Sequence, residues 1–326
     1  MATVGRLAGV SQVTVSRALS NPEKVSPETL KRIREAIEMT GFVPNALAGA
    51  LASSKSCLIS ALVPSITNIV YSSLLHGFSE IMRAHGYQIM LSETGFNPAD
   101  EEALIFTHLS RRPDGVLLTG IHHSTTARRM LLGAGIPVVE VWDITETPVD
   151  CCVGFSHPAS GRAVAEFAYE AGYKRAATVS AGDERAVRRR SAFSNRFEEL
   201  AGAPVQRIDF AEGPATLERG RHALRELVQV QGFKNGVIFC SSDLYAHGVM
   251  IEAQALGLAI PGDIAVIGFG DQDFAAHTVP PMTTVQVNRD ALGRAAAETL
   301  LARFHGEGPG ECVIDIGFQI IRRASA

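Results

Sequence analysis

The sequence repeats a strand-then-helix unit along most of its length, and this repeat limits the possible folds more than any other feature. Apolar, strand-like runs lie at residues 58–64, 88–92, 115–120, 137–142, 176–181, 205–210, 236–240 and 264–270. The segments between them have helical length, and such alternation predicts parallel sheets with helices on both faces. Two rounds of four units predict an α/β body of two doubly wound, parallel-sheet subdomains. Ligands of such folds bind beyond the carboxyl ends of the strands, so we expect a site in a cleft between the subdomains.

Residues 1–44 have a different pattern, which predicts three short helices. Gly9 ends the first helix, Ser11 is the expected N-cap of the second, and Ser26 followed by Pro27 opens the third. The residues expected to face the core of this head are Val4, Leu7, Ala8, Val15, Leu19, Leu30, Ile33, Ala36 and Ile37.

The charge pattern and the polar second helix indicate DNA binding. Residues 1–56 contain seven basic and four acidic residues, although the whole chain carries a net charge of −4. A basic head on an acidic body is expected if only the head meets a polyanion. Two helices joined by a tight turn with Gly form a helix-turn-helix, whose second helix fits the major groove. The alternative is an ordinary helical hairpin with a polar face.

The second helix supplies most of the expected DNA contacts. Gln12 and Arg17 can contact base edges, and Val13 can make an apolar contact such as one with a thymine methyl group. The residues better placed for phosphates are Ser11, Thr14, Ser16 and Lys24.

Three motifs in the head resemble a known family. The patterns V-S-x-x-T-V-S-R-x-L-x-N, V-S-x-x-T and G-F-V-P-N-A-L-A are similar to the DNA-binding head of the lactose-repressor family of bacterial transcription regulators. The resemblance continues through the body, which it implies is periplasmic-binding-protein-like. It implies a helix-turn-helix domain at 1–44, a hinge helix and linker at 45–56, and an effector-binding and dimerisation domain at 57–326.

The resemblance also assigns roles to individual residues of the hinge, from Asn45 to Ala52. It implies that this hinge helix folds only on operator DNA, with Asn45 at its start and Ala48 in the minor groove. Leu51 would be the apolar wedge that opens a central, CpG-like base step. The alternative for Leu51 is a linker leucine that packs on the body.

The resemblance implies that the chain crosses between subdomains near residues 157, 287 and 318. The subdomains would then comprise about 57–157 plus 287–317, and 158–286 plus 318–326. A homodimer formed through subdomain surfaces would carry its two heads to the half-sites of a near-palindromic operator. No additional helix follows the body, so we expect a dimer rather than a tetramer.

The head departs from the family pattern at two positions. Thr3 stands where an acidic residue is usual, and Gly5 stands where alanine is usual. Glycine inside a helix costs about 1 kcal/mol relative to alanine. Either the true start lies upstream, or this head is weaker than most.

Catalytic motifs are missing from the sequence. It contains no G-x-S-x-G, P-loop, H-E-x-x-H or G-x-G-x-x-G pattern. His122 and His123 are adjacent on an extended segment and therefore point apart, which disfavours a metal site. We expect neither an enzyme nor a cofactor nor a metal ion. The loop acids expected to be solvated are Asp143, Glu146 and Asp150.

Cysteine content and hydropathy indicate a cytoplasmic protein without a membrane partner. The five cysteines are scattered without C-x-x-C spacing, which favours reduced thiols. No apolar run reaches eighteen residues, and the N-terminus lacks the pattern of a signal peptide. A transporter's solute-binding protein would share the body fold, but it would need such a signal and would have no use for the head.

Strand ends and the resemblance nominate the effector-binding residues. Arg189 matches the family arginine that grips polar groups of the ligand, and its neighbours Arg188 and Arg190 are expected to face solvent. Asp243 is expected to be a helix N-cap, and Trp142 either offers a flat face to a sugar or packs in the core. The nominated residues are Ser65, Asn68, Tyr71, Thr119, His122, Trp142, Phe155, Arg189, Ser242 and Arg289.

Two departures from sugar-binding relatives indicate an anionic effector. Many sugar-binding members carry an acidic residue directly after the G-[YF] pair of the last long strand. This chain has Gly270 at that position, and its acidic residue, Asp271, comes one position later. Arg289 stands where the lactose repressor has an aromatic residue, and Arg pairs a carboxylate bidentately. The alternative for Arg289 is a surface salt bridge.

Three further segments narrow the effector class. IPVVEVWD, VGFSH and IDIGF resemble the gluconate-utilisation branch of the family. We expect a sugar acid, gluconate or a close keto or phosphorylated relative, whose binding releases the operator. The alternatives are a neutral sugar or other metabolite as effector, or a sensor whose head no longer binds DNA.

Overall fold

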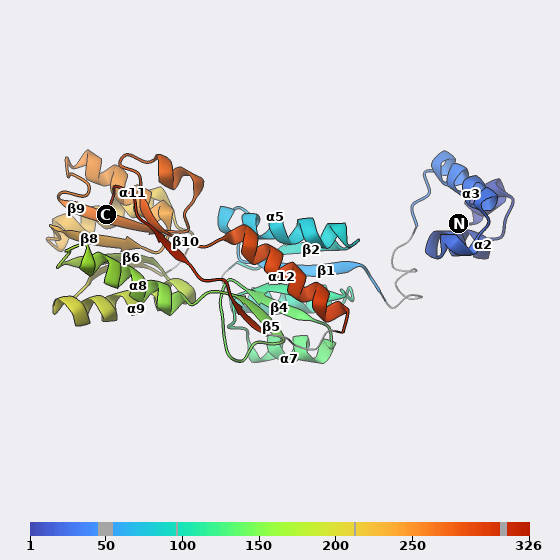
Figure 1. Ribbon diagram of the computed structural model, residues 1–326, viewed down its shortest axis with the longest axis horizontal. Coiled ribbons are helices and arrows are strands. Elements are labelled where there is room, and N and C mark those ends of the chain that lie inside the picture. The colour runs from blue at the N-terminus through green and yellow to red at the C-terminus, as the bar shows by residue number, and fades with distance from the viewer. Residues whose placement is uncertain (45–54, 96, 212, 307–311) are drawn as a thin grey trace. The chain divides into compact units, whose positions relative to one another are not determined.

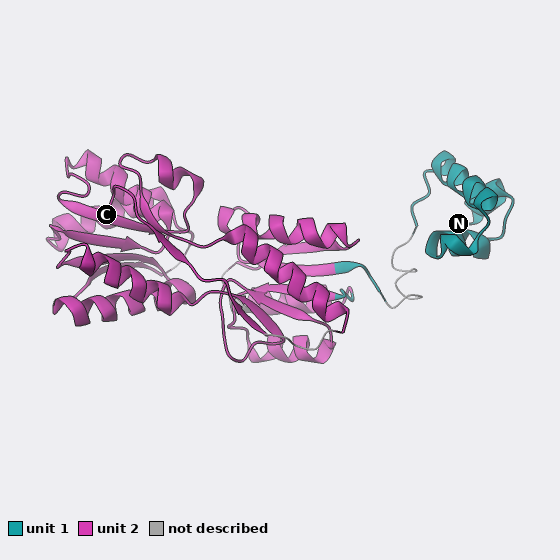
Figure 2. Ribbon diagram, in the orientation of Figure 1, with its two compact units in different colours: residues 1–58, 112–114 teal, residues 59–111, 115–326 magenta. Residues whose placement is uncertain are grey.

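The computed structural model describes residues 1–44, 55–95, 97–211, 213–306 and 312–326. The chain forms two compact units, one of residues 1–58 with 112–114 and one of residues 59–111 with 115–326 (Figure 2). The predicted hinge helix, with Asn45, Ala48 and Leu51, lies outside the described residues. In the part of the chain that the structure describes, no helix combines the length and the apolar character needed to span a bilayer.

The head consists of short helices with the predicted caps. Gly9 ends the first helix in the left-handed region at φ 64°, and the Ser11 and Ser26 hydroxyls accept hydrogen bonds from the backbone of the following helices. The elements are α1 (Ala2–Ala8), α2 (Gln12–Ser20), the 3₁₀ turn η1 (Pro22–Lys24) and α3 (Pro27–Thr40).

Two of the predicted core positions of the head are wrong. The side chains of Leu7 and Leu19 are 51% and 39% exposed, respectively. Ala18, three residues after Val15, faces the core instead of Leu19. The buried residues that form the core of the head are Val4, Ala8, Val15, Ala18, Ile33 and Ala36.

The first subdomain is built on a six-stranded sheet of order β11-β5-β4-β3-β1-β2 (Figure 1). Its strands are β1 (Leu58–Val63), β2 (Gln88–Glu93), β3 (Gly115–Thr119), β4 (Val138–Val141), β5 (Cys151–Gly154) and β11 (Val313–Asp315). Its helices are α5 (Ile69–Ala84), α6 (Pro98–Leu109), α7 (Thr125–Ala134) and α12 (Arg289–Phe304).

Alternate residues of β1 face opposite layers of helices. Ile59, Ala61 and Val63 belong to a core cluster with residues of α5 and α12, whereas Leu62 belongs to a cluster with residues of α6 and α7. Both faces of the sheet are therefore covered. This explains why its strands are apolar throughout rather than alternating with polar residues.

The second subdomain repeats the plan with sheet order β12-β10-β9-β8-β6-β7. Its strands are β6 (Ala176–Ala181), β7 (Gln206–Phe210), β8 (Gly236–Cys240), β9 (Ile264–Phe269), β10 (Thr283–Gln286) and β12 (Gln319–Ile321). Its helical segments are α8 (His157–Glu170), α9 (Glu184–Ala201), α10 (Leu217–Arg225), the π-helical turn η2 (Glu226–Val230), α11 (Asp243–Ala255) and the 3₁₀ turn η3 (Asp273–His277).

The predicted fold class is confirmed, but the second sheet is not wholly parallel. All eight predicted strands exist within two residues of their expected bounds. The edge strand β12 runs antiparallel to β10, with Val285 opposite Ile320. Four short strands were not predicted, namely β5, β10, β11 and β12.

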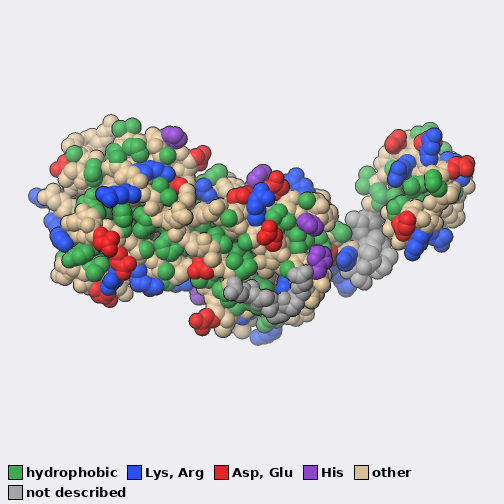
Figure 3. Space-filling model, in the orientation of Figure 1, with side chains coloured by type: hydrophobic (Ala, Val, Ile, Leu, Met, Phe, Trp, Pro, Cys, Tyr) green, Lys and Arg blue, Asp and Glu red, His purple; other side chains and the backbone are tan. Residues whose placement is uncertain are grey.

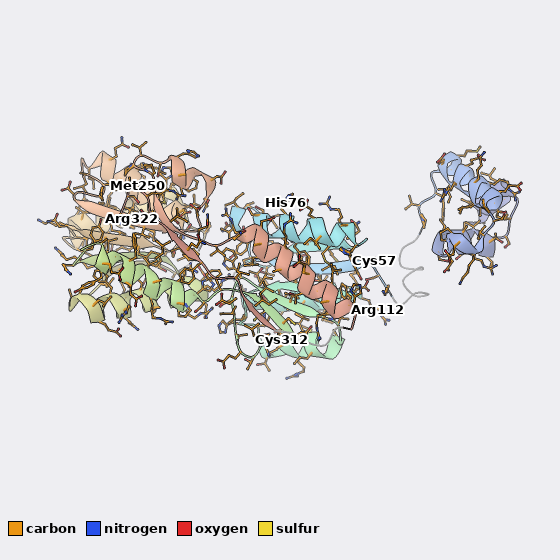
Figure 4. All side chains as sticks on the ribbon, viewed as in Figure 1. Cys57, His76, Arg112, Met250, Cys312 and Arg322 are labelled. Carbon is orange, nitrogen blue, oxygen red and sulfur yellow. The ribbon has the colours of Figure 1, made fainter. Side chains whose placement is uncertain are left out.

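The chain passes repeatedly between the two subdomains. Strand β5 lies in the first sheet and β6 in the second, and after β10 the chain returns to α12, which packs against α5. Figure 4 shows Cys312, before β11, in the first subdomain and Arg322, after β12, in the second. Three connections therefore join the subdomains.

Close packing of α8 against α9 depends on Gly161. A Cβ atom at this position would lie 2.2 Å from the Arg189 backbone oxygen. Gly161→Ala should therefore lower the free energy of unfolding by about 1–3 kcal/mol, because the helices must move apart. Urea denaturation followed by circular dichroism measures this change.

Gly133 in α7 provides a matched control, because a Cβ there would meet no atom within 4 Å. Gly133→Ala should stabilise the chain by up to about 1 kcal/mol through helix propensity. Equal stabilisation by both substitutions would contradict the close approach of α8 and α9.

Candidate functional site

Helix α2 presents a polar, exposed face. Gln12, Val13, Ser16 and Arg17 are exposed, while Val15 on the opposite face is fully buried. Buried packing on one face fixes the helix and leaves the other face available to a partner. Lys and Arg side chains lie on the visible surface of the head (Figure 3).

Three of the four predicted phosphate-binding residues lie near the ends of α2, and the fourth, Ser16, lies on its exposed face. Ser11 and Thr14 share a hydrogen bond of 3.0 Å between their hydroxyls at the start of the helix. Lys24 is exposed at the end of the turn that follows α2. These side chains flank the exposed face of α2.

Gly5 occupies a place where the chain comes close to itself. It is buried, and a Cβ atom there would lie 2.7 Å from the backbone oxygen of Val10 in the turn before α2. Glycine thus permits close packing of α1 on this turn, which offsets its weak helix propensity.

A second cluster forms where the order of each sheet reverses. In the first sheet β1 lies next to β3, and in the second β6 lies next to β8. In such sheets the crevice at this switch point, beyond the carboxyl ends of the strands, is where ligands bind. The segments that follow β1, β3, β4, β6 and β8 supply the polar and aromatic groups described below.

Aromatic rings pack together at this junction. The Trp142 ring meets the Tyr71 ring edge-on at 6.1 Å between centroids and the Phe155 ring at 5.4 Å. Trp142 is only 4% exposed and has a positive φ of 74°. Gly154 makes this bend possible, since a Cβ atom there would lie 2.3 Å from the Asp143 backbone oxygen. Trp142 is therefore packed among other rings in this structure.

Arg189 lies one turn inside α9 and is 5% exposed. Its Nη1 lies 2.8 Å from Nδ1 of His157, its Nη2 donates to the Ser241 carbonyl at 3.2 Å, and its guanidinium stacks 3.9 Å above the Phe269 ring. Its Nε has no hydrogen-bond partner within the described part of the chain. Burial lowers the pKa of Arg189 to about 10, which leaves the group charged at neutral pH.

His157 orients Arg189 and is itself fixed by the backbone. Its Nε2 lies 2.9 Å from the Trp142 carbonyl, which can only accept a hydrogen bond, so Nε2 carries the proton. Nδ1 then accepts from Arg189. Burial, together with the charge of Arg189, lowers the pKa of His157 well below its ordinary value, so the ring is neutral.

The expectation that Arg188 and Arg190 face solvent is wrong. Arg188 pairs with Asp143 and Arg190 pairs with Asp209, and all four side chains are at least half buried. Asp143, predicted to be a solvated loop acid, is 1% exposed, and burial raises its pKa. It reaches across from the end of β4 to α9.

Asp150 also differs from its prediction as a solvated acid. Its carboxylate accepts from the Val138 backbone at 3.1 Å and pairs with Arg303 of α12 at 2.6 Å. It therefore ties α12 to the sheet. Glu146 is exposed, as predicted.

Sequence reasoning missed Arg185, which is 9% exposed beside Arg189. Its Nη2 donates to the Tyr71 hydroxyl at 3.2 Å, and its Nη1 is buried without a hydrogen-bond partner among the residues described. The spacing of four residues from Arg189 places both on one face of α9, and this spacing could have indicated Arg185.

Asp243 is not the N-cap of α11. The Ser242 hydroxyl caps the helix, accepting from the Leu244 backbone at 3.3 Å. The Asp243 carboxylate is fully buried and accepts from the Thr284 hydroxyl at 2.6 Å and from the Gln272 backbone at 2.7 Å. Burial raises the pKa of Asp243 to about 6. It fixes the loop after β9.

Arg289 and Asp271 both make contacts within the protein. Arg289 donates to the carbonyls of Gly270 and Asp271 at 3.2 and 3.3 Å rather than forming a surface salt bridge. The Asp271 carboxylate accepts from Arg323 at 2.8 Å and from Gln286 at 2.7 Å. Both side chains thus stabilise the loop between β9 and β10.

The remaining nominated residues surround the same junction. Ser65 lies 3.1 Å from the Thr67 hydroxyl, and Asn68 is exposed and caps α5. Thr119 is buried and donates to the Leu62 carbonyl at 3.2 Å.

The His122–His123 doublet points in two directions, as predicted. His122 is exposed, with Nε2 3.1 Å from Glu184 of the second subdomain. His123 is buried, with Nδ1 2.6 Å from Glu101 and Nε2 3.2 Å from Glu140. The second contact is an ion pair without a hydrogen bond.

The buried His123 ion cluster gives a pH-dependent stability. Burial opposes protonation, but the Glu101 and Glu140 carboxylates raise the pKa of His123 to about 9, against 6.5 when unfolded. Protonated His123 therefore contributes on the order of 2–3 kcal/mol to the free energy of unfolding. This contribution is complete below pH 6.5 and is lost as the pH rises through 9. His123→Gln should remove this loss between pH 6.5 and 9 in urea denaturation. An unchanged slope would contradict the assignment.

Comparison with known proteins agrees over the whole chain. Residues 1–45 match the family described as bacterial regulatory proteins, lacI family, and residues 165–326 match the periplasmic binding protein-like domain. The HTH-type transcriptional regulator GntR of Pseudomonas aeruginosa is 35% identical, covering 99% of this chain and 94% of that protein. GntR of Escherichia coli K12 is 33% identical, covering 96% and 94%.

A solved structure shares the whole architecture. The crystal structure of a LacI-family transcriptional regulator from Silicibacter pomeroyi is 32% identical, with a TM-score of 0.93, and covers 99% of this chain and 98% of that one. These three relatives are named as regulators, which confirms the prediction that the chain is not an enzyme.

Proposed function

We propose, because the chain belongs to the lacI family of bacterial regulatory proteins, that a sugar acid bound between its two subdomains controls its affinity for operator DNA. The chain is a DNA-binding transcription regulator of this family. The proposal concerns how it recognises DNA, which effector it binds, and how the two are coupled.

The exposed face of α2 is the proposed reading surface. Gln12 and Arg17 would contact base edges, since Arg pairs with guanine O6 and N7 and Gln with adenine. Val13 would make an apolar contact. Ser11, Thr14, Ser16 and Lys24 would hold phosphates, and a homodimer would place two heads on a near-palindromic operator.

The observation that carries the effector proposal is the excess of buried guanidinium groups over buried acids at the junction. Asp143 is paired with Arg188, whereas Arg185 and Arg189 each retain an N–H group without a partner among the described residues. A buried donor left unpaired is costly, so such groups favour an acceptor-rich anionic ligand. A sugar acid provides a carboxylate and several hydroxyls.

Gluconate is the effector that we propose first. The segments IPVVEVWD, VGFSH and IDIGF support it through their likeness to the gluconate-utilisation branch. The residues proposed to line the effector site are Ser65, Asn68, Tyr71, Thr119, His122, Trp142, Phe155, Arg189, Ser242 and Arg289.

The proposed mechanism is thermodynamic linkage. Effector and operator would favour different orientations of the two subdomains, and a coupling of about 1–3 kcal/mol would change operator affinity roughly 5- to 150-fold. By reciprocity, bound operator would weaken effector binding equally. We propose that the effector releases the operator.

Substitution of Arg17 tests the reading surface. Arg17→Ala should weaken operator binding by about 1–3 kcal/mol and relax specificity at one base pair. Arg34→Ala removes the same charge from an exposed position on α3 and should weaken binding less than about threefold, because salt screens distant charges. Fluorescence anisotropy at fixed salt, with DNA from upstream of its own gene, measures both. Equal effects would argue against α2 as the reading helix.

Addition of D-gluconate to the same complex tests the effector. We expect operator affinity to fall roughly 5- to 150-fold with gluconate but not with D-glucose, because glucose lacks the carboxylate. A response to glucose instead would favour a neutral-sugar sensor. Tight DNA binding that neither compound changes would overturn gluconate as the effector.

A further inference from the structure

We propose that Arg185, rather than Arg289, binds the carboxylate of the effector and thereby distinguishes an acid from a neutral sugar. This inference deepens the proposed function and rests on it. It assigns a role to a side chain that the sequence motifs did not indicate.

The position of Arg185 is set by the first turn of α9. Asp183 caps this helix by accepting from the Ala186 backbone at 3.1 Å, and Arg185 follows two residues later. Its side chain reaches the first subdomain, where Nη2 donates to the Tyr71 hydroxyl at 3.2 Å. Nη1 lies 3.6 Å from the place of a Cβ atom on Gly120, directly after β3. The guanidinium therefore lies at the switch points of both sheets.

The charge of Arg185 is only weakly compensated. The acid that pairs with it, Asp183, lies 3.9 Å from Nε, is partly exposed and already caps α9. Asp143 is paired with Arg188 instead. A carboxylate on Nη1 would satisfy a buried donor and neutralise a buried charge in one contact.

Arg189 assists from the next turn of α9. Its Nη1 and Nη2 are used by His157 and Ser241, and only Nε lacks a hydrogen-bond partner in the described ranges. Arg185 therefore offers Nη1, and Arg189 offers Nε.

Arg289 has a different environment. Both of its Nη groups donate to backbone carbonyls of the loop after β9. Rotation toward a ligand would leave those two carbonyls without these donors. The structure thus assigns Arg289 to holding this loop.

Calorimetric titration of the full chain with D-gluconate and with D-glucitol, the neutral six-carbon polyol, tests the assignment. Wild type should prefer gluconate, and Arg185→Gln should weaken gluconate binding roughly 10- to 100-fold while changing glucitol binding much less. Arg190→Gln is the matched control on the same helix, since Arg190 pairs with Asp209, and it should change gluconate affinity less than about threefold. Arg289→Gln tests the competing residue.

Two additions keep the result interpretable. Arg185→Lys retains the positive charge and serves as the test if Arg185→Gln fails to fold. This variant should still prefer gluconate to glucitol. It should bind gluconate about tenfold more weakly than wild type, because an ammonium group lacks the planar fork of a guanidinium. The thermal midpoint of each variant with sodium sulfate tests anion binding without a sugar. Sulfate should raise the thermal midpoint of wild type more than that of Arg185→Gln, because the general stabilising effect of sulfate is common to both.

The outcomes separate this inference from the proposed function. Unchanged gluconate affinity in Arg185→Gln, or loss confined to Arg289→Gln, overturns the role of Arg185 and leaves a sugar-acid effector in place. No binding of gluconate, together with sulfate stabilisation that requires Arg185, overturns gluconate and supports the anion site. Absence of both responses overturns both.

Discussion

The hydrogen bond between Arg189 and His157 is the contact on which the geometry of the proposed effector site depends. It joins helix α9 to the residue where the chain enters the second subdomain, and His157 in turn binds the carbonyl at the end of β4. The neutral imidazole can serve as acceptor and donor at once only because burial and the neighbouring guanidinium keep it unprotonated. The positions of Trp142, Asp143 and the arginines of α9 follow from this link.

Much of the fold could be predicted from the sequence because its signals are local. Buried strands of five or six residues, helix caps such as Ser11 and Ser26, and the left-handed Gly9 each depend on a few neighbouring residues. The short edge strands β11 and β12 could not be predicted, because three residues carry too weak a pattern and their partners are distant in sequence.

The candidate site was predicted less completely, for a physical reason. Strand ends indicated where Tyr71 and Thr119 would gather, since parallel strands bring their carboxyl ends to one edge, whereas Arg189 was indicated by the family resemblance. The partner of each charged side chain, by contrast, is decided by contacts between the two subdomains. Asp143 resembles a solvated loop acid until Arg188 of the other subdomain is placed beside it.

Trp142 gives the chain a built-in optical reporter. It is the only tryptophan in the sequence, and its ring lies between two others at the junction of the subdomains. All indole emission of the protein therefore arises from one place, beside the groups proposed to hold the effector. A spectroscopist could follow rearrangement of this junction in the unlabelled protein, with no background from the head or from the outer helices.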